Sequence, residues 1–311
     1  MKDRLIDILK RSDQILFPEI NIYNQKFSKK QLLILFLAFL FVFSMFGFVF
    51  LPGGFIGFDW INFFSQGRIP PFYPPWGKVI IQLLSWPLLV GLTLASFGIA
   101  AVRRSVHPVS LVLSFFSLPL MWTIFLGQLE GISLFGLLWM PWLVPFALLK
   151  PQVAIFAFLS KKKYLIILGL FLLISLLIWG LWPINTLNVE SFYAEGRYTQ
   201  NIGLGWWGLP IAILLMWFSR GDLDMLMLSG CFFLPHLIPY NLLPLTPAIA
   251  RLSPKKAIIA FILSWTPFLA NYIGPIGWWF GWLFIIWLWV SLFIVHNKKT
   301  NSKEIKDLSL G

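Results

Sequence analysis

The residue best suited to chemistry in this 311-residue chain is Asp59, in the stretch GFDWINFFSQGRIPPFYPPW at 57–76. Phe58 and Trp60 flank it, and a long apolar segment precedes it. A carboxyl group partly removed from water has a raised pKa, which suits a general base that takes a proton from a hydroxyl near neutral pH. The alternative interpretation is an ordinary loop carboxylate that caps the short segment after it.

Three basic residues could donate hydrogen bonds to a phosphate, namely Arg68, Lys78 and Arg197. Arginine binds phosphate through two parallel hydrogen bonds, and lysine binds it as a point charge. Each side chain could instead extend to lipid headgroups or pair with Glu190 or Glu195. If the protein has a phosphate ligand, we expect it to use at least one of the three.

The segment PPFYPPW at 70–76 has four prolines in six positions, which hold the chain extended and stiff. It could be a rigid loop that returns the chain to the membrane. It could also be a fixed wall for a sugar or lipid, with Tyr73 stacking on the ligand or anchoring at the interface. The two interpretations are compatible.

Two further motifs, GQLEG at 127–131 and LPHLIPYN at 234–241, contain the remaining candidates: Gln128, Glu130, His236, Tyr240 and Asn241. The glutamine could bind a sugar or brace a loop. The glutamate could be a second acid, and with the aspartate above it could share a divalent cation. A lone histidine is usually structural, but this one lies at a proline-flanked turn and is a site candidate.

Other kinds of site are not supported by the sequence. It has no phosphate-binding glycine loop, nucleophile elbow, HExxH motif or dinucleotide fingerprint. The single cysteine, Cys231, allows neither an internal disulfide nor a cysteine metal cluster. We therefore predict no soluble cofactor and no dedicated metal centre.

The composition predicts a membrane protein. Hydrophobic residues make up 59% of the chain and charged residues 12%, whereas soluble domains carry about 25% charged residues. The net charge of +12 comes from basic residues that lie between apolar runs. That pattern is typical of the positive-inside rule rather than of nucleic-acid binding.

We predict an all-α integral membrane bundle of about ten transmembrane or half-membrane helices, with an active-site loop after the first span. The segment between 132 and 163 is expected to be two short helices broken near Pro141 and Pro145. A hairpin of two short helices is expected at 225–250. The other spans are expected at 32–50, 79–102, 109–126, 164–181, 206–218, 257–270 and 276–295.

This topology divides the chain into a basic cytoplasmic segment at 1–30, one transmembrane domain at 31–296 and a cytoplasmic tail at 297–311. The first segment is either an interfacial amphipathic helix or a solvated tail. We expect a multi-pass protein of the plasma membrane with both termini inside. Of 24 lysines and arginines, only Arg68, Lys78 and Arg197 are then expected outside. The span interiors are expected to be almost free of charge, apart from an interfacial Lys150.

The order of these motifs resembles the membrane glycosyltransferases of the GT-C superfold, and is most similar to glycosyltransferase family 87. The likeness rests on Asp59 after the first span, the Tyr-Pro-Pro run, GQLEG, LLKPQ at 148–152 and LPHLIPYNLLPLTPAIA at 234–250. Glu130 stands where the family usually has asparagine, the segment after Gln128 is compressed, and the chain is short.

The resemblance implies transfer of a hexose, with mannose as the type case, from a polyprenyl-phosphate donor to a hydroxyl of a glycan or glycolipid acceptor. The reaction would invert the anomeric carbon at the extracytoplasmic face, with Asp59 as general base. An outer basic residue would stabilise the leaving phosphate.

Two other functions fit the same features. A transporter or flippase for a lipid-linked substrate would need a polar path across the bilayer, which a nearly uncharged set of spans does not favour. A GT-C-like assembly protein without catalysis would fit the short length.

Overall fold

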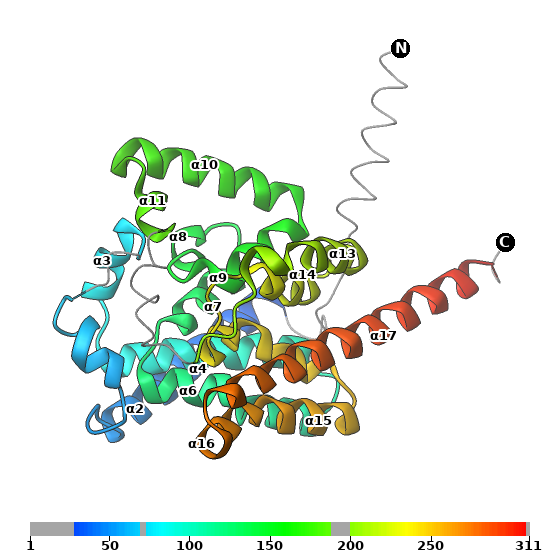
Figure 1. Ribbon diagram of the computed structural model, residues 1–311, viewed down its shortest axis with the longest axis horizontal. Coiled ribbons are helices and arrows are strands. Elements are labelled where there is room, and N and C mark those ends of the chain that lie inside the picture. The colour runs from blue at the N-terminus through cyan, green and yellow to red at the C-terminus, as the bar shows by residue number, and fades with distance from the viewer. Residues whose placement is uncertain (1–27, 69–72, 188–199, 309–311) are drawn as a thin grey trace, which may run out of the picture.

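The computed structural model describes residues 28–68, 73–187 and 200–308, and this part of the chain is helical without strands (Figure 1). The predicted N-terminal segment at 1–30 lies almost entirely outside the described residues. Arg197 also lies outside them. Within the described residues, six helices or helix pairs are long and apolar enough to cross a membrane. The predicted count of about ten is therefore not confirmed.

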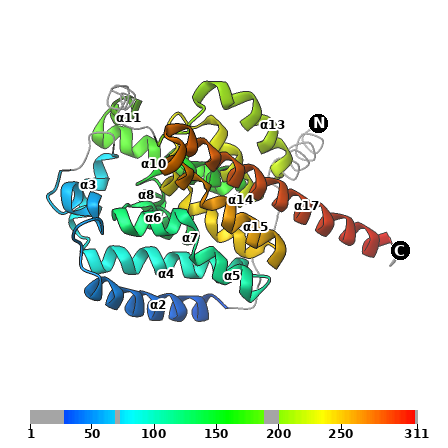
Figure 2. The same ribbon diagram turned by 60° about the horizontal axis from the view of Figure 1, so that its bottom comes forward.

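The first half of the bundle begins with α2 and α4, which pack side by side along their lengths (Figure 2). A Cβ atom at Gly91 or Gly98 of α4 would meet α2 at Ser44 or Phe39 at under 3 Å, so only glycine permits this approach. The elements here are α2 (Lys29–Val49), η1 (Trp60–Phe64), α3 (Pro75–Gln82), α4 (Trp86–Arg104), α5 (Pro108–Phe115) and α6 (Leu118–Leu126).

The middle of the chain is a broken segment, as its prolines predicted. Helix α7 ends at Leu138, and turns containing Pro141 separate it from α8. The elements are α7 (Glu130–Leu138), α8 (Val144–Ala147), α9 (Pro151–Ala154), η2 (Ile155–Ser160), α10 (Lys162–Trp179) and α11 (Trp182–Leu187). The break returns the chain to α7, where the backbone N–H of Lys150 donates to Ser133 Oγ at 3.0 Å.

The predicted hairpin at 225–250 is also present. Helix α14 leads into a turn, and the buried 3₁₀ helix η5 returns beside it, so that Arg251 bonds Asp222 just before α14. The elements are η3 (Gly205–Gly208), α13 (Leu209–Ser219), α14 (Leu223–Gly230), η4 (Cys231–Phe233) and η5 (Pro239–Arg251). Pro244 and Pro247 lie inside η5 and lack the N–H of a regular helical ladder.

The last elements cover η5 and α14. They are α15 (Pro254–Ser264), η6 (Thr266–Leu269), α16 (Ala270–Ile273), η7 (Pro275–Phe280) and α17 (Gly281–Leu308). Helix α17 runs continuously past the predicted domain boundary at 296/297 and extends away from the body (Figure 1). The predicted tail therefore begins as a continuation of the last helix.

Large apolar side chains cover the outside of the bundle as well as its core. Phe41 on α2, Leu177 on α10 and Trp217 on α13 are each more than two-thirds exposed. Exposed apolar surface on this scale is typical of a protein that faces lipid. The structure thus supports a multi-pass membrane protein; its orientation and its membrane remain predictions.

Candidate functional site

The loop that follows α2 is held against the end of α6, and this contact brings Asp59 beside Gln128. The backbone N–H of Gly57 donates to Phe125 O at 2.6 Å. Gly127 ends α6 in the left-handed region with φ 72°, where a Cβ atom would lie 2.7 Å from Trp60 Cβ. Only glycine fits that turn. The next residue, Gln128, donates its side-chain N–H to the carboxylate of Asp59.

Asp59 has the environment that a general base requires. It precedes η1, yet its side chain makes no capping hydrogen bond, so the capping interpretation finds no support. Burial raises the pKa of Asp59, while the hydrogen bond from Gln128 and the charge of Lys150 act to lower it. Glu130 raises it further.

Glu130 connects α7 to the first turn of η5. Its Oε1 accepts a hydrogen bond of 2.8 Å from Asn241 Nδ2 and lies 3.4 Å from Lys150 Nζ. Asn241 is fixed in turn, because its Oδ1 accepts from the backbone N–H of Ile238 at 2.9 Å. Both Glu130 and Asn241 are buried. We call Asp59, Gln128, Glu130, Lys150 and Asn241 the Asp59 cluster.

The Asp59 cluster has hydrogen-bonding capacity left over. Within the described residues, Gln128 Oε1 and Glu130 Oε2 are buried and have no hydrogen-bond partner. A buried acceptor without a donor is costly, and a structure keeps one mainly where a ligand or water supplies the donor.

Two tyrosines from distant parts of the chain enclose the ammonium group of Lys150. It lies 4.9 Å from the ring centroid of Tyr73 and 5.4 Å from that of Tyr240. Tyr73 also packs edge-on against Phe64 of η1. Aromatic faces attract a cation and exclude water from it.

His236 lies near the same charge. Its side chain is partly buried, and burial, with the charge of Lys150 as a second cause, lowers its pKa to about 3. The imidazole is therefore neutral at physiological pH and can only exchange hydrogen bonds there.

Among the described residues, the basic side chains predicted to serve a phosphate do not join this group. Arg68 and Lys78 are exposed, and Arg197 lies outside the described residues. The cation beside the acids is instead Lys150, which is only 8% exposed. Lys150 was expected only as an interfacial residue, and the broken middle segment brings it beside Glu130. The signal in the sequence was a lysine inside an apolar run, directly before Pro151.

A second buried charge cluster was also missed. Arg104 binds Asp224 through Nε and Nη2 at 2.9 to 3.2 Å. Arg251 binds Asp222 and Asp224 at 2.6 to 2.9 Å. We call these four residues the arginine cluster. All four residues lie outside the spans expected from the sequence, which predicted charges at these positions but not their burial and pairing.

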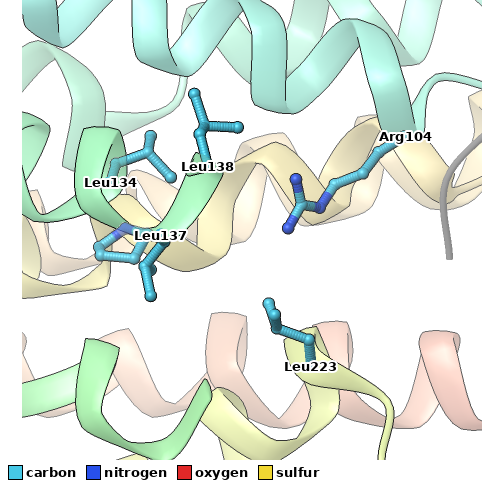
Figure 3. A pocket seen from close by; sticks show the side chains of 6 residues that line it. Arg104, Leu134, Leu137, Leu138 and Leu223 are labelled. Atoms are coloured by element: carbon cyan, nitrogen blue, oxygen red, sulfur yellow. The ribbon is translucent and has the colours of Figure 1, made fainter. Parts of the chain in front are cut away.

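The two clusters lie at opposite ends of α4. Trp86 begins the helix and packs on Trp60, next to Asp59, at a ring distance of 6.4 Å. Arg104 ends the helix 18 residues later, which is roughly 27 Å along its axis. A small pocket beside Arg104 is otherwise apolar, with Leu134, Leu137 and Leu138 of α7 and Leu223 of α14 in its wall (Figure 3).

No group of three or more histidine, cysteine or acidic side chains suited to a metal occurs in the part of the chain that the structure describes. No protein-family model, curated protein or solved structure matches this chain.

Proposed function

We propose that the chain is an integral membrane glycosyltransferase that uses a polyprenyl-phosphate hexose, with mannose as the first candidate. The acceptor is a hydroxyl of a glycan or glycolipid, and the reaction takes place at the extracytoplasmic face of the plasma membrane. The observation that carries this proposal is the carboxyl group of Asp59, which is partly desolvated, hydrogen-bonded by Gln128 and close to the buried cation Lys150.

The chemistry follows from these positions. Asp59 takes the proton of the acceptor hydroxyl as the acceptor oxygen forms a bond to the anomeric carbon. The bond from that carbon to the phosphate oxygen breaks, and its electron pair leaves with the polyprenyl phosphate. Attack opposite the leaving group inverts the anomeric centre. Gln128 orients the base and holds its carboxylate form.

Neutral groups around the base suit the sugar and the acceptor. Tyr73 and Tyr240 offer ring faces on which a sugar can stack. The open acceptor oxygens of Gln128 and Glu130 match hydroxyl donors. His236 is uncharged at physiological pH and adds a neutral hydrogen-bonding group rather than a second base.

One observation favours the transporter as a second candidate. The arginine cluster lies at the far end of α4 from Asp59, so buried charge is not confined to one end. Its two arginines and two aspartates are paired with one another, however, which leaves little capacity for a moving substrate. The glycosyltransferase remains the better supported function. A transfer assay separates it from the other two candidates, and movement of the intact lipid-linked sugar separates the transporter from the inactive assembly protein.

The test is hexose transfer by the purified protein in vesicles that contain polyprenyl-phosphate mannose, polyprenyl-phosphate glucose and a mixed glycolipid acceptor. We expect wild-type protein to transfer one of the sugars and Asp59→Asn to transfer none. The matched control is Gln66→Asn, an exposed position on the same loop, which should transfer normally. Movement of an intact lipid-linked sugar across the vesicle without transfer would identify the transporter.

A further inference from the structure

We propose that Lys150 is the phosphate subsite of the lipid donor, and that Glu130 holds this subsite as an exchangeable counter-ion until the phosphate arrives. The inference rests on the proposed function and deepens it. It assigns the phosphate to Lys150 rather than to Arg68, Lys78 or Arg197. It also gives the buried Glu130 a role.

Lys150 is positioned more firmly than a surface lysine. Its backbone N–H donates to Ser133 Oγ of α7 at 3.0 Å. Its ammonium group faces Glu130, which lies one turn before Ser133 on the same helix. Tyr73 and Tyr240 flank the ammonium. A charge that is fixed in advance in a site with little water stabilises a developing anion far better than a mobile charge in solvent.

The ion pair with Glu130 is loose. Its N to O distance is 3.4 Å, whereas strong pairs of this kind measure about 2.7–2.9 Å. The same oxygen of Glu130 accepts a shorter hydrogen bond from Asn241, at 2.8 Å. Glu130 is therefore anchored by Asn241, and a better ligand can replace it at the ammonium.

The charge around Lys150 also stays balanced during transfer. When Asp59 and Glu130 are both ionised, two negative charges lie near one ammonium group. An anion can therefore bind Lys150 before the reaction only by displacing Glu130. During transfer the acceptor proton neutralises Asp59 while the leaving phosphate gains one negative charge. The total charge around Lys150 is then unchanged, and the ammonium keeps a counter-charge throughout.

The binding experiment separates this inference from the proposed function, because it needs no turnover. Radiolabelled farnesyl phosphate is titrated against the full-length protein in nanodiscs of phosphatidylcholine. We expect Lys150→Met to lose binding by about tenfold or more, Lys150→Arg to restore part of it, and Lys255→Met, an exposed matched lysine, to bind as wild type does. Asp59→Asn should bind as well as wild type or better.

Glu130→Gln provides the sharper result. Removing a negative charge close to the ammonium should tighten farnesyl phosphate binding by about tenfold, whereas a variant that merely damages the fold would weaken it. Thermal unfolding of each variant is measured alongside. Unchanged or weaker binding by a folded Glu130→Gln variant would overturn the exchange.

Competition identifies the source of the phosphate. Unlabelled farnesyl phosphate should displace the label, and farnesol, inorganic phosphate and phosphatidic acid should each compete at least tenfold less well. Equal competition by phosphatidic acid or by inorganic phosphate would replace the prenyl subsite with a general anion site and overturn the assignment. Normal transfer by Asp59→Asn would remove the proposed function but leave the binding results standing.

Discussion

The Asp59 cluster and the arginine cluster are both buried and both charged, but they differ in how completely their groups are paired. In the arginine cluster, two arginines meet two aspartates through six hydrogen bonds of 2.6 to 3.2 Å. In the Asp59 cluster, one lysine faces two acids, its ion pair measures 3.4 Å, and two acceptor oxygens have no partner among the described residues.

This difference indicates what each region is for. Buried charges with complete partners fix an arrangement of helices, here α4, α14 and η5, and offer little to a ligand. Buried polar groups that lack hydrogen-bond partners are unfavourable for stability. A protein that keeps them has these groups available to bind a ligand or a proton. Stability should therefore depend on the arginine cluster, and activity on the Asp59 cluster.

The largest expected effect on stability comes from breaking the arginine cluster. Arg251→Met removes the arginine partner of Asp222 and one of the four arginine hydrogen bonds to Asp224. A buried charge without its partner costs about 3–5 kcal/mol of unfolding free energy. Denaturant unfolding in detergent measures the loss. Lys255→Met is the control, and an Arg251→Met protein as stable as that control would contradict the structural role.

The next expected effect tests the Asp59 cluster, through the pH dependence of transfer. The base must be ionised, so the rate should rise with pH through the raised pKa of Asp59. The charge of Lys150 lowers that pKa and Glu130 raises it. Lys150→Met should therefore move the acidic limb of the rate profile to higher pH, and Glu130→Gln should move it to lower pH.

Residual activity of both variants makes that measurement possible, with Lys255→Met as the reference profile. Identical acidic limbs in all the proteins would mean that the limb does not belong to Asp59.

A smaller effect concerns His236 and acid stability. Its folded pKa of about 3 lies below the ordinary value of 6.5, so the unfolded chain binds a proton that the folded chain does not. This contribution to stability is full above pH 6.5 and is lost as the pH falls toward 3. His236→Gln cannot titrate and should show a shallower fall of the thermal midpoint over that range; an equally steep fall would exclude this histidine as the cause.

The smallest expected effect is that of chelation. Lys150 lies 3.4 Å from Glu130 and its charge acts on Asp59, so it already supplies positive charge to both acids. We expect EDTA to leave the transfer rate unchanged, and added Mg²⁺ or Mn²⁺ to raise it less than twofold. Loss of transfer on chelation, with recovery on adding one metal, would restore the shared-cation interpretation.

The sequence was informative wherever a local pattern decides the structure. Asp59 and Gln128 follow the ends of two apolar helices, so alternation of the spans places them at the same face. Proline spacing predicted the break after Leu138, and the charges at both ends of 225–250 predicted the hairpin that places Asn241 near Glu130. In each case, residues close in the sequence determine where the chain turns.

The sequence was least informative about the partners of charges. Lys150 follows an apolar run and precedes a basic turn, a pattern that predicts an interfacial lysine but not its pairing with Glu130. Arg104 and Asp224 are 120 positions apart, and no local pattern links them. Each residue looks like an ordinary boundary charge until the packing of α4 against η5 and α14 brings the two together.

The central claim is that Asp59 serves chemistry rather than folding, and one paired measurement tests it most directly. The transfer rate and the thermal midpoint of Asp59→Asn are measured on the same reconstituted preparation as the wild type. Because burial raises the pKa of this carboxyl, a neutral side chain should leave the midpoint unchanged or raise it, while transfer falls by about 10²–10⁴-fold. Transfer at the wild-type rate by the folded variant would contradict the account.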